Sequence, residues 1–266
     1  MQLFCFGYGY VAQFLSYTLL ERGWTIGGTS SIKKTDNSIT IYRYDRVNKD
    51  FLRASTHILI SVPPEGDDIL ERYGDEMRNI KWLGYLSATN VYGDHAGHWV
   101  TEESETRPIE VRGKSRIHAE IKWMHSILPI HIFRLSGIYG PQRNVLVDLQ
   151  HHKARNIQKT GHLFSRIHVF DIINIILSSM QRVRPGEIYN CADDLPATQS
   201  EVLMYGAQLL NMALPQPTEI STLSEHGQSF FLGSKKVSNL KIKQDLKISL
   251  MFANYKIGLK ELYRKL

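Results

Sequence analysis

Short apolar runs alternate with amphipathic stretches along the first half of the chain. Apolar runs of this length, flanked by turn residues, are typical of strands buried in a parallel sheet. The runs that predict strands are Leu3–Phe6, Trp24–Gly27, Ile39–Tyr44, His57–Val62, Trp82–Ser87 and Ile130–Leu135. Between them, apolar residues recur at three- and four-residue spacing and predict helices over Val11–Arg22, Asp67–Ile80 and Ile109–Ile127. Strands that alternate with helices predict an α/β fold whose parallel sheet is covered on both faces.

The alternation becomes less regular after about residue 141. Helices are expected over Val145–Arg155, Asp171–Gln181 and Gln199–Leu210, and a strand over Glu187–Ala192. We therefore predict a sheet domain over residues 1–140, with residues 141–266 as a mixed segment that completes the sheet and forms a small substrate-binding cap. Ligands of open α/β sheets sit outside the carboxyl ends of the strands, so such a cap would close the site.

The composition is that of an ordinary globular protein, with 266 residues of which 42% are hydrophobic and 22% are charged. The formal net charge of +6 is dispersed along the chain rather than gathered into runs. Nucleic-acid and membrane partners usually require a basic stripe or tail, so neither is expected. An anionic small molecule, such as a phosphorylated cofactor, fits the same charge.

The cysteines and the apolar runs indicate the compartment. Cys5 and Cys191 are too few and too far apart for a disulfide framework or a metal finger, which favours a reducing environment. The chain starts without a basic segment or a cleavage site, and no apolar run approaches the ~18 residues of a membrane helix. We expect a cytoplasmic protein.

The first sharp motif is FCFGYGYVAQFL, in which Gly7, Gly9 and Ala12 form the pattern G-x-G-x-x-A between a predicted strand and a predicted helix. The first glycine permits a tight turn, the second lets a pyrophosphate approach the backbone, and the alanine allows close packing of the helix on the strand. The helix N-terminus then offers N–H groups to the phosphates. We expect a dinucleotide to contact Gly7, Tyr8, Gly9, Tyr10 and Val11. The alternative is a glycine turn that binds nothing.

The end of the second predicted strand bears on the choice of dinucleotide. An acidic residue there would hold the ribose hydroxyl of NAD, but the sequence WTIGGTSSIKK has none. Hydroxyl and ammonium groups suit a 2′-phosphate, so Thr29, Ser30, Ser31 and Lys33 favour NADP, with NAD as the alternative. Lysines in a polar loop are also common on any solvated surface.

Five further segments carry a family resemblance: YLSATNVYGDHAGHWVTEES, RPIEVRGKSRIHAE, FRLSGIYGPQRN, FSRIHVFDI and EIYNCADDLPATQSEV. Together and in this order, the sequence resembles the extended short-chain dehydrogenase/reductases, also called the NAD-dependent epimerase/dehydratase family. The resemblance implies a Rossmann-type doubly wound parallel sheet, a small C-terminal substrate-binding region and often a nucleotide-sugar or related substrate. It also leads us to expect cofactor contacts from Asp45, Val62, Pro63, Ser87 and Leu135.

The same resemblance indicates an atypical active site. Members of the family use a Tyr and, four residues later, a Lys; these positions hold Arg112 and Arg116, and the Ser/Thr position holds Ala88. The family Tyr exchanges a proton with the substrate, whereas a guanidinium group stays protonated below pH ~12 and is a poor base. Arg116 could still donate hydrogen bonds to a cofactor ribose. The other candidates for a catalytic role are Thr89 and Tyr92.

Gly113-Lys114-Ser115 also matches the end of a phosphate-binding loop, but Pro108 stands where that motif requires glycine. We therefore interpret the match as chance. For Arg112 and Arg116 the alternative to ligand binding is a solvated helix face with ion pairs to neighbouring glutamates.

Substrate contacts are expected from four residues that match stretches lining the substrate cleft in the family: Tyr139, Arg143, Arg166 and His168. An arginine in such a place commonly binds a diphosphate or carboxylate through paired hydrogen bonds. The alternative for Tyr139 is a packed core aromatic. His95 and His98 lack a third ligand, so no metal site is expected.

Three functions remain open at this stage. The chain is either a reductase or epimerase with a displaced acid/base, an NADP(H)-binding sensor without activity, or a scaffold that binds neither cofactor nor substrate. A homodimer is expected through the helix that carries Ile109, Ile117, Ile121 and Met124, because active relatives use this helix to dimerise.

Overall fold

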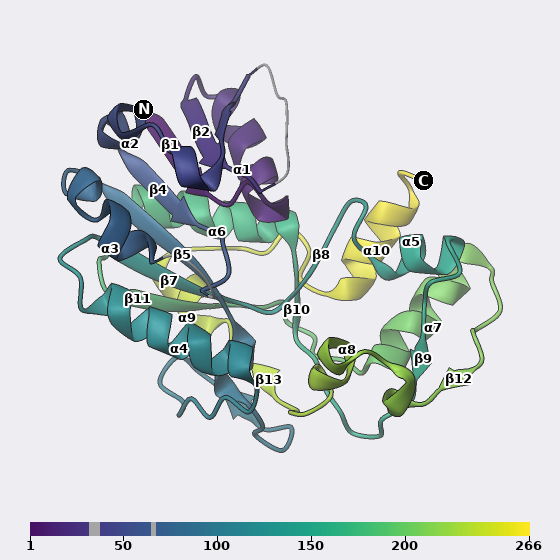
Figure 1. Ribbon diagram of the computed structural model, residues 1–266. Coiled ribbons are helices and arrows are strands. Elements are labelled where there is room, and N and C mark those ends of the chain that lie inside the picture. Colours follow the sequence, from purple (N-terminus) through teal and green to yellow (C-terminus); the bar gives the residue numbers. More distant parts are fainter. Residues whose placement is uncertain (32–37, 65–67) are drawn as a thin grey trace. The chain divides into compact units, whose positions relative to one another are not determined.

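The structure is a computed structural model, and it describes residues 1–31, 38–64 and 68–266 (Figure 1). The chain forms two compact units. Unit 1 comprises Met1–Ala88, Ser115–Arg134 and Ile173–Tyr189; unit 2 comprises Thr89–Lys114, Leu135–Ile172 and Asn190–Leu266. Each unit is built from three separate stretches, so the boundary after residue 140 that the sequence predicts does not coincide with a boundary between the units.

Unit 1 is organised around a seven-stranded sheet with the order β11-β7-β5-β4-β1-β2-β3. The strands are β1 Gln2–Phe6, β2 Thr25–Thr29, β3 Thr40–Tyr42, β4 His57–Ile60, β5 Trp82–Ala88, β7 Ile130–Leu135 and β11 Glu187–Cys191. The pairings of β1 with β2 and β4, of β2 with β3 and of β4 with β5 are all parallel. The chain proceeds from β1 towards β3 and then returns to β4 on the other side of β1, so the switch point of this doubly wound sheet lies between β1 and β4.

The helices of this α/β layer confirm most of the predicted pattern. They are α1 Tyr10–Leu20, α2 Lys49–Ala54, α3 Ile69–Tyr73, α4 Val111–Met124 and α6 Val169–Gln181, with the 3-10 turns η1 Tyr44–Arg46 and η2 Asp75–Met77. The helix predicted over Asp67–Ile80 is wrong in length, because Asp68 caps its start and the chain tightens into η2 after Gly74. The strand predicted over Ile39–Tyr44 is likewise shorter, since Tyr44 begins η1.

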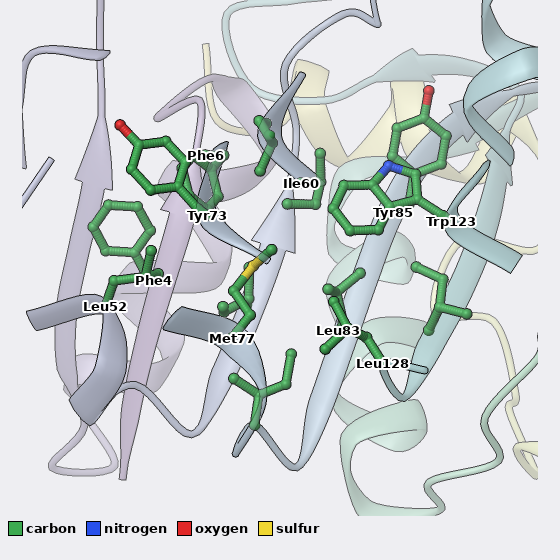
Figure 2. Close-up of a cluster of buried hydrophobic side chains, with 14 of the residues drawn as sticks. Phe4, Phe6, Leu52, Ile60, Tyr73, Met77, Leu83, Tyr85, Trp123 and Leu128 are labelled. Carbon is green, nitrogen blue, oxygen red and sulfur yellow. The ribbon is translucent and has the colours of Figure 1, made fainter. Parts of the chain in front are cut away.

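One face of the sheet carries a cluster of buried apolar side chains (Figure 2). Alternate residues of four strands point to this face, as the two-residue period of a strand requires. They are Phe4, Phe6, Ile58, Ile60, Leu83, Tyr85, Ile130 and Ile132. Side chains from α2, α3 and α4 complete the cluster, among them Leu52, Tyr73 and Trp123. Each such side chain stabilises the fold by about 1.5–3 kcal/mol on burial.

The opposite face is covered by α6, as the contact from Trp82 shows. Trp82 lies next to Leu83 in β5 and therefore points the other way, where its indole N–H donates to the Ser179 hydroxyl at 3.0 Å. Helices thus cover both faces, which is the arrangement the sequence predicts for buried parallel strands.

Unit 2 contains short helices and three two-stranded sheets. Its helices are α5 Val145–Gln150, α7 Gln199–Leu210, α8 Glu225–Ser229, α9 Leu240–Asp245 and α10 Tyr255–Tyr263, with the 3-10 turns η3 Thr89–Tyr92 and η4 Ile220–Thr222. The pairs are β8 Gly137–Tyr139 with β10 Arg166–His168, β9 Asn156–Ile157 with β12 Pro217–Thr218, and β6 Trp99–Val100 with β13 Lys236–Val237. The helix predicted to reach Arg155 ends at Gln150, because His152 adopts a left-handed conformation with φ 54°.

None of the helices in the described part of the chain has the length and apolarity that a membrane span requires.

Candidate functional site

The turn between β1 and α1 lies at the switch point of the sheet. Gly7 has φ +91°, and a Cβ atom there would lie 2.7 Å from Val62 Cγ1, so both the backbone and the packing require glycine. The Gly7 N–H donates to the Thr29 hydroxyl at 2.9 Å, and the Tyr8 N–H donates to the Thr29 carbonyl at 2.6 Å. These contacts tie the turn to the end of β2.

Gly9 differs from Gly7 in that the protein's own packing leaves space for a side chain. Its backbone is extended, with φ −89°, and the nearest atom to a Cβ there would be the Ser61 hydroxyl oxygen at 3.9 Å. Gly9 is the N-cap residue of α1, and as a glycine it has no side chain that could accept from the first N–H groups of the helix. Open space beside the N-terminus of a helix is what a pyrophosphate needs, so the residues present fit a dinucleotide.

The end of β2 presents hydroxyl groups in different settings. Thr29 is buried and its hydroxyl accepts the Gly7 hydrogen bond, whereas Ser30 is partly buried and Ser31 is exposed. Lys33, which we expect to favour NADP, lies outside the described residues, as does Lys34. Asp45 lies in η1 and forms an exposed ion pair of 3.0 Å with Arg43, whose hydrogen bond lowers the pKa of the Asp45 carboxyl.

Val62 and Pro63, two of the expected cofactor contacts, follow β4. Both line a pocket of about 320 Å³ that lies within unit 1. Tyr85 and Trp123 also line it, and Lys122 at its wall forms ion pairs with Asp68 and Glu71.

Ser87 is buried at the end of β5, where its hydroxyl is hydrogen-bonded to a carboxylate. The hydroxyl donates to Glu120 Oε1 at 2.5 Å, and Glu120 in turn pairs with Arg134 at 2.7 Å. Ser87 thus takes part in a buried network within unit 1, and its expected contact with the cofactor stays a prediction.

The three residues that the resemblance aligns with the family triad lie at the end of β5 and in α4. Ala88 is the last residue of β5, Arg112 is exposed in the first turn of α4, and Arg116 is partly buried one turn later. Gly113 has a packing role, because a Cβ there would lie 2.8 Å from Pro108 Cβ. The Gly-Lys-Ser match therefore lies inside a helix and is no phosphate-binding loop, as predicted.

The two hydroxyl residues expected as candidates for a catalytic role lie in η3 and differ in burial. Thr89 is partly buried. Tyr92 is fully buried, and its hydroxyl donates to Asn190 Oδ1 at 2.8 Å. The backbone N–H of Asn190 donates to the Glu102 carboxylate at 2.7 Å. This network fixes the Tyr92 hydroxyl within the fold.

Tyr139 and His168 pack together in unit 2, with ring centroids 5.0 Å apart. Tyr139 belongs to the apolar core of this unit, and a Cβ at Gly258 would collide with its hydroxyl, so its setting is that of a packed aromatic. Nδ1 of His168 accepts a hydrogen bond from the Phe170 N–H at 3.2 Å. Burial lowers the pKa of His168 to about 4, which keeps the ring neutral at pH 7.

The remaining residues of unit 2 that were expected to contact cofactor or substrate differ in burial and partners. Arg143 is exposed beside a bridge to Gly140, and Leu135 is buried at the end of β7. Arg166 is partly buried, and its guanidinium donates to two backbone carbonyls. Next to it lies Asp193, a buried carboxyl that sequence reasoning missed. The acidic pair Asp193-Asp194 directly after a predicted strand was the signal that could have identified it.

The residues described here contain no group of three or more His, Cys, Asp or Glu side chains that could hold a metal ion.

Known proteins resemble the chain over most of its length, although no family model matches it. Protein YeeZ of Escherichia coli K12 is 22% identical, over 88% of this chain and 91% of its own. A dTDP-D-glucose 4,6-dehydratase of Bos taurus is 26% identical over 68% of this chain, which spans about half (52%) of that enzyme. A conserved protein of unknown function from Silicibacter pomeroyi has a TM-score of 0.92 and 37% identity, over 99% of this chain and 98% of its own.

Two structures of lower identity share the fold. The dTDP-glucose 4,6-dehydratase of Bacillus anthracis, in complex with NAD, has a TM-score of 0.82 and 17% identity over 99% of this chain and 96% of its own. The UDP-glucuronic acid 4-epimerase of Bacillus cereus, in complex with UDP-glucuronic acid and NAD, has a TM-score of 0.78 and 15% identity over 99% and 98%. The chain thus resembles NAD-dependent epimerases and dehydratases in sequence and shares their fold. The resemblance found in the sequence and the fold class are thereby confirmed.

Proposed function

We propose that this protein is a member of the epimerase/dehydratase family and binds NADP(H) at the β1–α1 turn. The observation that carries the proposal is the open position at Gly9, where the fold leaves space beside the N-terminus of α1. A nicotinamide dinucleotide, when bound, supplies hydride transfer. Gly9 would admit its pyrophosphate, and the first N–H groups of α1 would donate to the phosphate oxygens.

The preference for NADP over NAD rests on the end of β2. Ser30 and Ser31 follow the strand where a carboxylate would select the NAD ribose, and a carboxylate there would repel a 2′-phosphate. The relatives with known ligands are complexes with NAD, so the two cofactors must be compared directly.

The reaction we infer is oxidation–reduction or epimerisation of an anionic, sugar-nucleotide-like small molecule with a non-standard active site. The names of the relatives support this substrate class, and Arg166 offers a guanidinium for an anionic group. With arginines at positions 112 and 116, proton transfer requires a different acid. Of the two candidate hydroxyl residues, Thr89 and Tyr92, only Thr89 is not fully buried.

A second candidate function is an NADP(H)-binding sensor that performs no reaction. It is favoured by the burial of Tyr92, whose hydroxyl is engaged by Asn190 and is therefore not available for proton transfer. Such a protein would bind the cofactor without exchanging hydride.

A fluorescence titration of the full chain with NADPH and with NADH tests the proposal. We expect saturable binding with preference for NADPH, and Ser31→Asp should weaken NADPH binding about tenfold or more while sparing NADH. Ser221→Asp, which adds the same charge at an exposed position of unit 2, serves as the matched control. Absence of binding for both nucleotides at near-millimolar concentration would overturn the cofactor assignment. Oxidation of bound NADPH by nucleotide-sugar ketones would then separate the enzyme from the sensor.

A further inference from the structure

Arg166 and Asp193 lie side by side in unit 2. The Asp193 N–H donates to the Arg166 carbonyl oxygen at 2.6 Å, so the two backbones run next to each other. The Asp193 side chain is buried, with the residue 1% exposed. Its Oδ1 accepts a hydrogen bond from the Leu195 N–H at 3.2 Å, while Oδ2 has no hydrogen-bond partner in the described part of the chain. A buried carboxylate oxygen without a partner is costly and requires an explanation.

The Arg166 guanidinium is held in place by carbonyl groups rather than by a carboxylate. Nη1 donates to the Phe164 carbonyl at 3.1 Å and to the Ala197 carbonyl at 3.0 Å, and the group lies 5.8 Å from the centre of the Phe164 ring. No ion pair among the described residues includes Arg166. A fixed guanidinium whose charge is not neutralised by a direct ion pair is suited to binding an oxyanion.

The other ionisable groups around this pair have partners. Asp171 of α6 accepts two backbone N–H bonds, Asp194 pairs with Lys243, and Glu201 of α7 accepts from Thr198. Tyr139 of β8 and Tyr255 of α10 also face the pair, and both have raised pKa values because they are buried. Asp193 is therefore distinguished from its described acidic neighbours by its unsatisfied oxygen.

We propose that unit 2 binds an oxyanion at Arg166 together with one proton on Asp193 Oδ2. The inference rests on the anionic ligand at Arg166 that is part of the proposed function. An ionised Asp193 would repel the incoming anion, whereas the protonated carboxyl removes that repulsion and turns its unsatisfied oxygen into a hydrogen-bond donor. The ligand group is a phosphate or a carboxylate, since both present the oxygens that a guanidinium and an O–H group bind.

The protonation behaviour of Asp193 supports this coupling. Burial raises the pKa of Asp193 to about 7, although Arg166 opposes the shift, and Asp194 and Asp171 raise the pKa further. Anion affinity should therefore be high below pH 7 and fall about tenfold for each pH unit above it. By reciprocity, a bound anion should raise the pKa of Asp193.

The test is an NMR titration of the full-length chain with sulfate, and separately with acetate, at constant ionic strength from pH 6 to pH 9. Both probes keep a constant charge over this range. We expect the dissociation constant of wild-type protein to increase about tenfold per unit above pH 7. Asp193→Asn should bind with the low-pH affinity at every pH. Asp194→Asn makes the same charge change on the neighbouring residue and should keep the wild-type slope.

A pH-independent affinity in the wild type, a retained slope in Asp193→Asn, or no binding of either anion at any pH would overturn the inference. If Asp193→Asn does not fold, the side-chain ¹³C resonance of Asp193 is followed against pH in the wild-type protein, with and without sulfate. The inference requires that sulfate raise the pKa of Asp193, and an unchanged pKa would overturn it. Preference for sulfate or for acetate identifies the phosphate or the carboxylate as the ligand group. The NADPH titration is independent of these outcomes, so cofactor binding and the anion site can fail separately.

Discussion

The carboxylate of Glu120 and the guanidinium of Arg134 form an ion pair of 2.7 Å with both side chains only 5% exposed. Arg134 donates from two nitrogens, and the Ser87 hydroxyl donates to the same carboxylate. Glu120→Ala would remove the carboxylate that pairs with the buried guanidinium of Arg134. We expect a loss of about 3–5 kcal/mol in the free energy of unfolding, measured by urea denaturation.

Glu103→Ala is the matched control for this prediction, because Glu103 is exposed. Its effect should stay within about 0.5 kcal/mol. Equal effects of the two variants would contradict a structural role for the buried pair.

The two glycines of the β1–α1 turn should respond differently to alanine. Gly7→Ala must accommodate φ +91° and a contact of 2.7 Å with Val62, which costs about 1–2 kcal/mol for the backbone and about 1–3 kcal/mol for overpacking. Gly9→Ala meets open space and should leave stability nearly unchanged while it weakens NADPH binding. Thermal unfolding and the NADPH titration, run on both variants, separate the two roles. Unchanged NADPH affinity in Gly9→Ala would argue against a pyrophosphate at this position.

Gly113 provides a test of the packing role inside α4. Gly113→Ala should destabilise the protein by about 1–3 kcal/mol, because its Cβ would lie 2.8 Å from Pro108 Cβ. Lys114→Ala, at the exposed neighbouring position, should have little effect on stability. A strong effect of Lys114→Ala on nucleotide binding, measured by the NADPH titration, would contradict the interpretation of Gly113-Lys114-Ser115 as a chance match.

His57 should make the protein less stable in mild acid. Burial, followed by the charges of Lys81 and the N-terminus, lowers the pKa of His57 from 6.5 to about 4. The unfolded chain then binds a proton between these values while the folded chain does not, so this contribution to stability is present above pH 6.5 and is lost as the pH falls towards 4. The expected loss from pH 7 to pH 5 is about 2 kcal/mol.

Urea denaturation at pH 7 and pH 5 measures this effect of His57. His57→Gln should reduce the difference between the two pH values by about that amount, whereas His125→Gln, at an exposed position of unit 1, should not. An undiminished pH dependence in His57→Gln would assign the loss to other groups.

Much of unit 1 could be predicted from local pattern. The strands β1, β4, β5 and β7 were located to within about two residues, because a strand buried on both faces must be apolar throughout. The spacing of Gly7, Gly9 and Ala12 also identified the turn before α1, because the turn requires small residues at positions that lie close together in the sequence. Patterns of this kind depend on neighbours in sequence, so the sequence contains them in full.

The short elements of unit 2 escaped prediction for the opposite reason. A two-residue strand such as β6 has no period of its own and exists only because β13 pairs with it. The left-handed His152 that ends α5 likewise lacks a glycine signal.

By itself, the sequence determined the class of the fold and the glycine turn, because these are properties of residue types at fixed spacing. Only the tertiary structure decided which polar groups are satisfied. It brought Ser87 to Glu120, Tyr92 to Asn190 and Arg166 beside Asp193, pairs separated by long stretches of chain. Hydrogen bonding and burial are set by such distant neighbours, and these decide which side chains are available for chemistry.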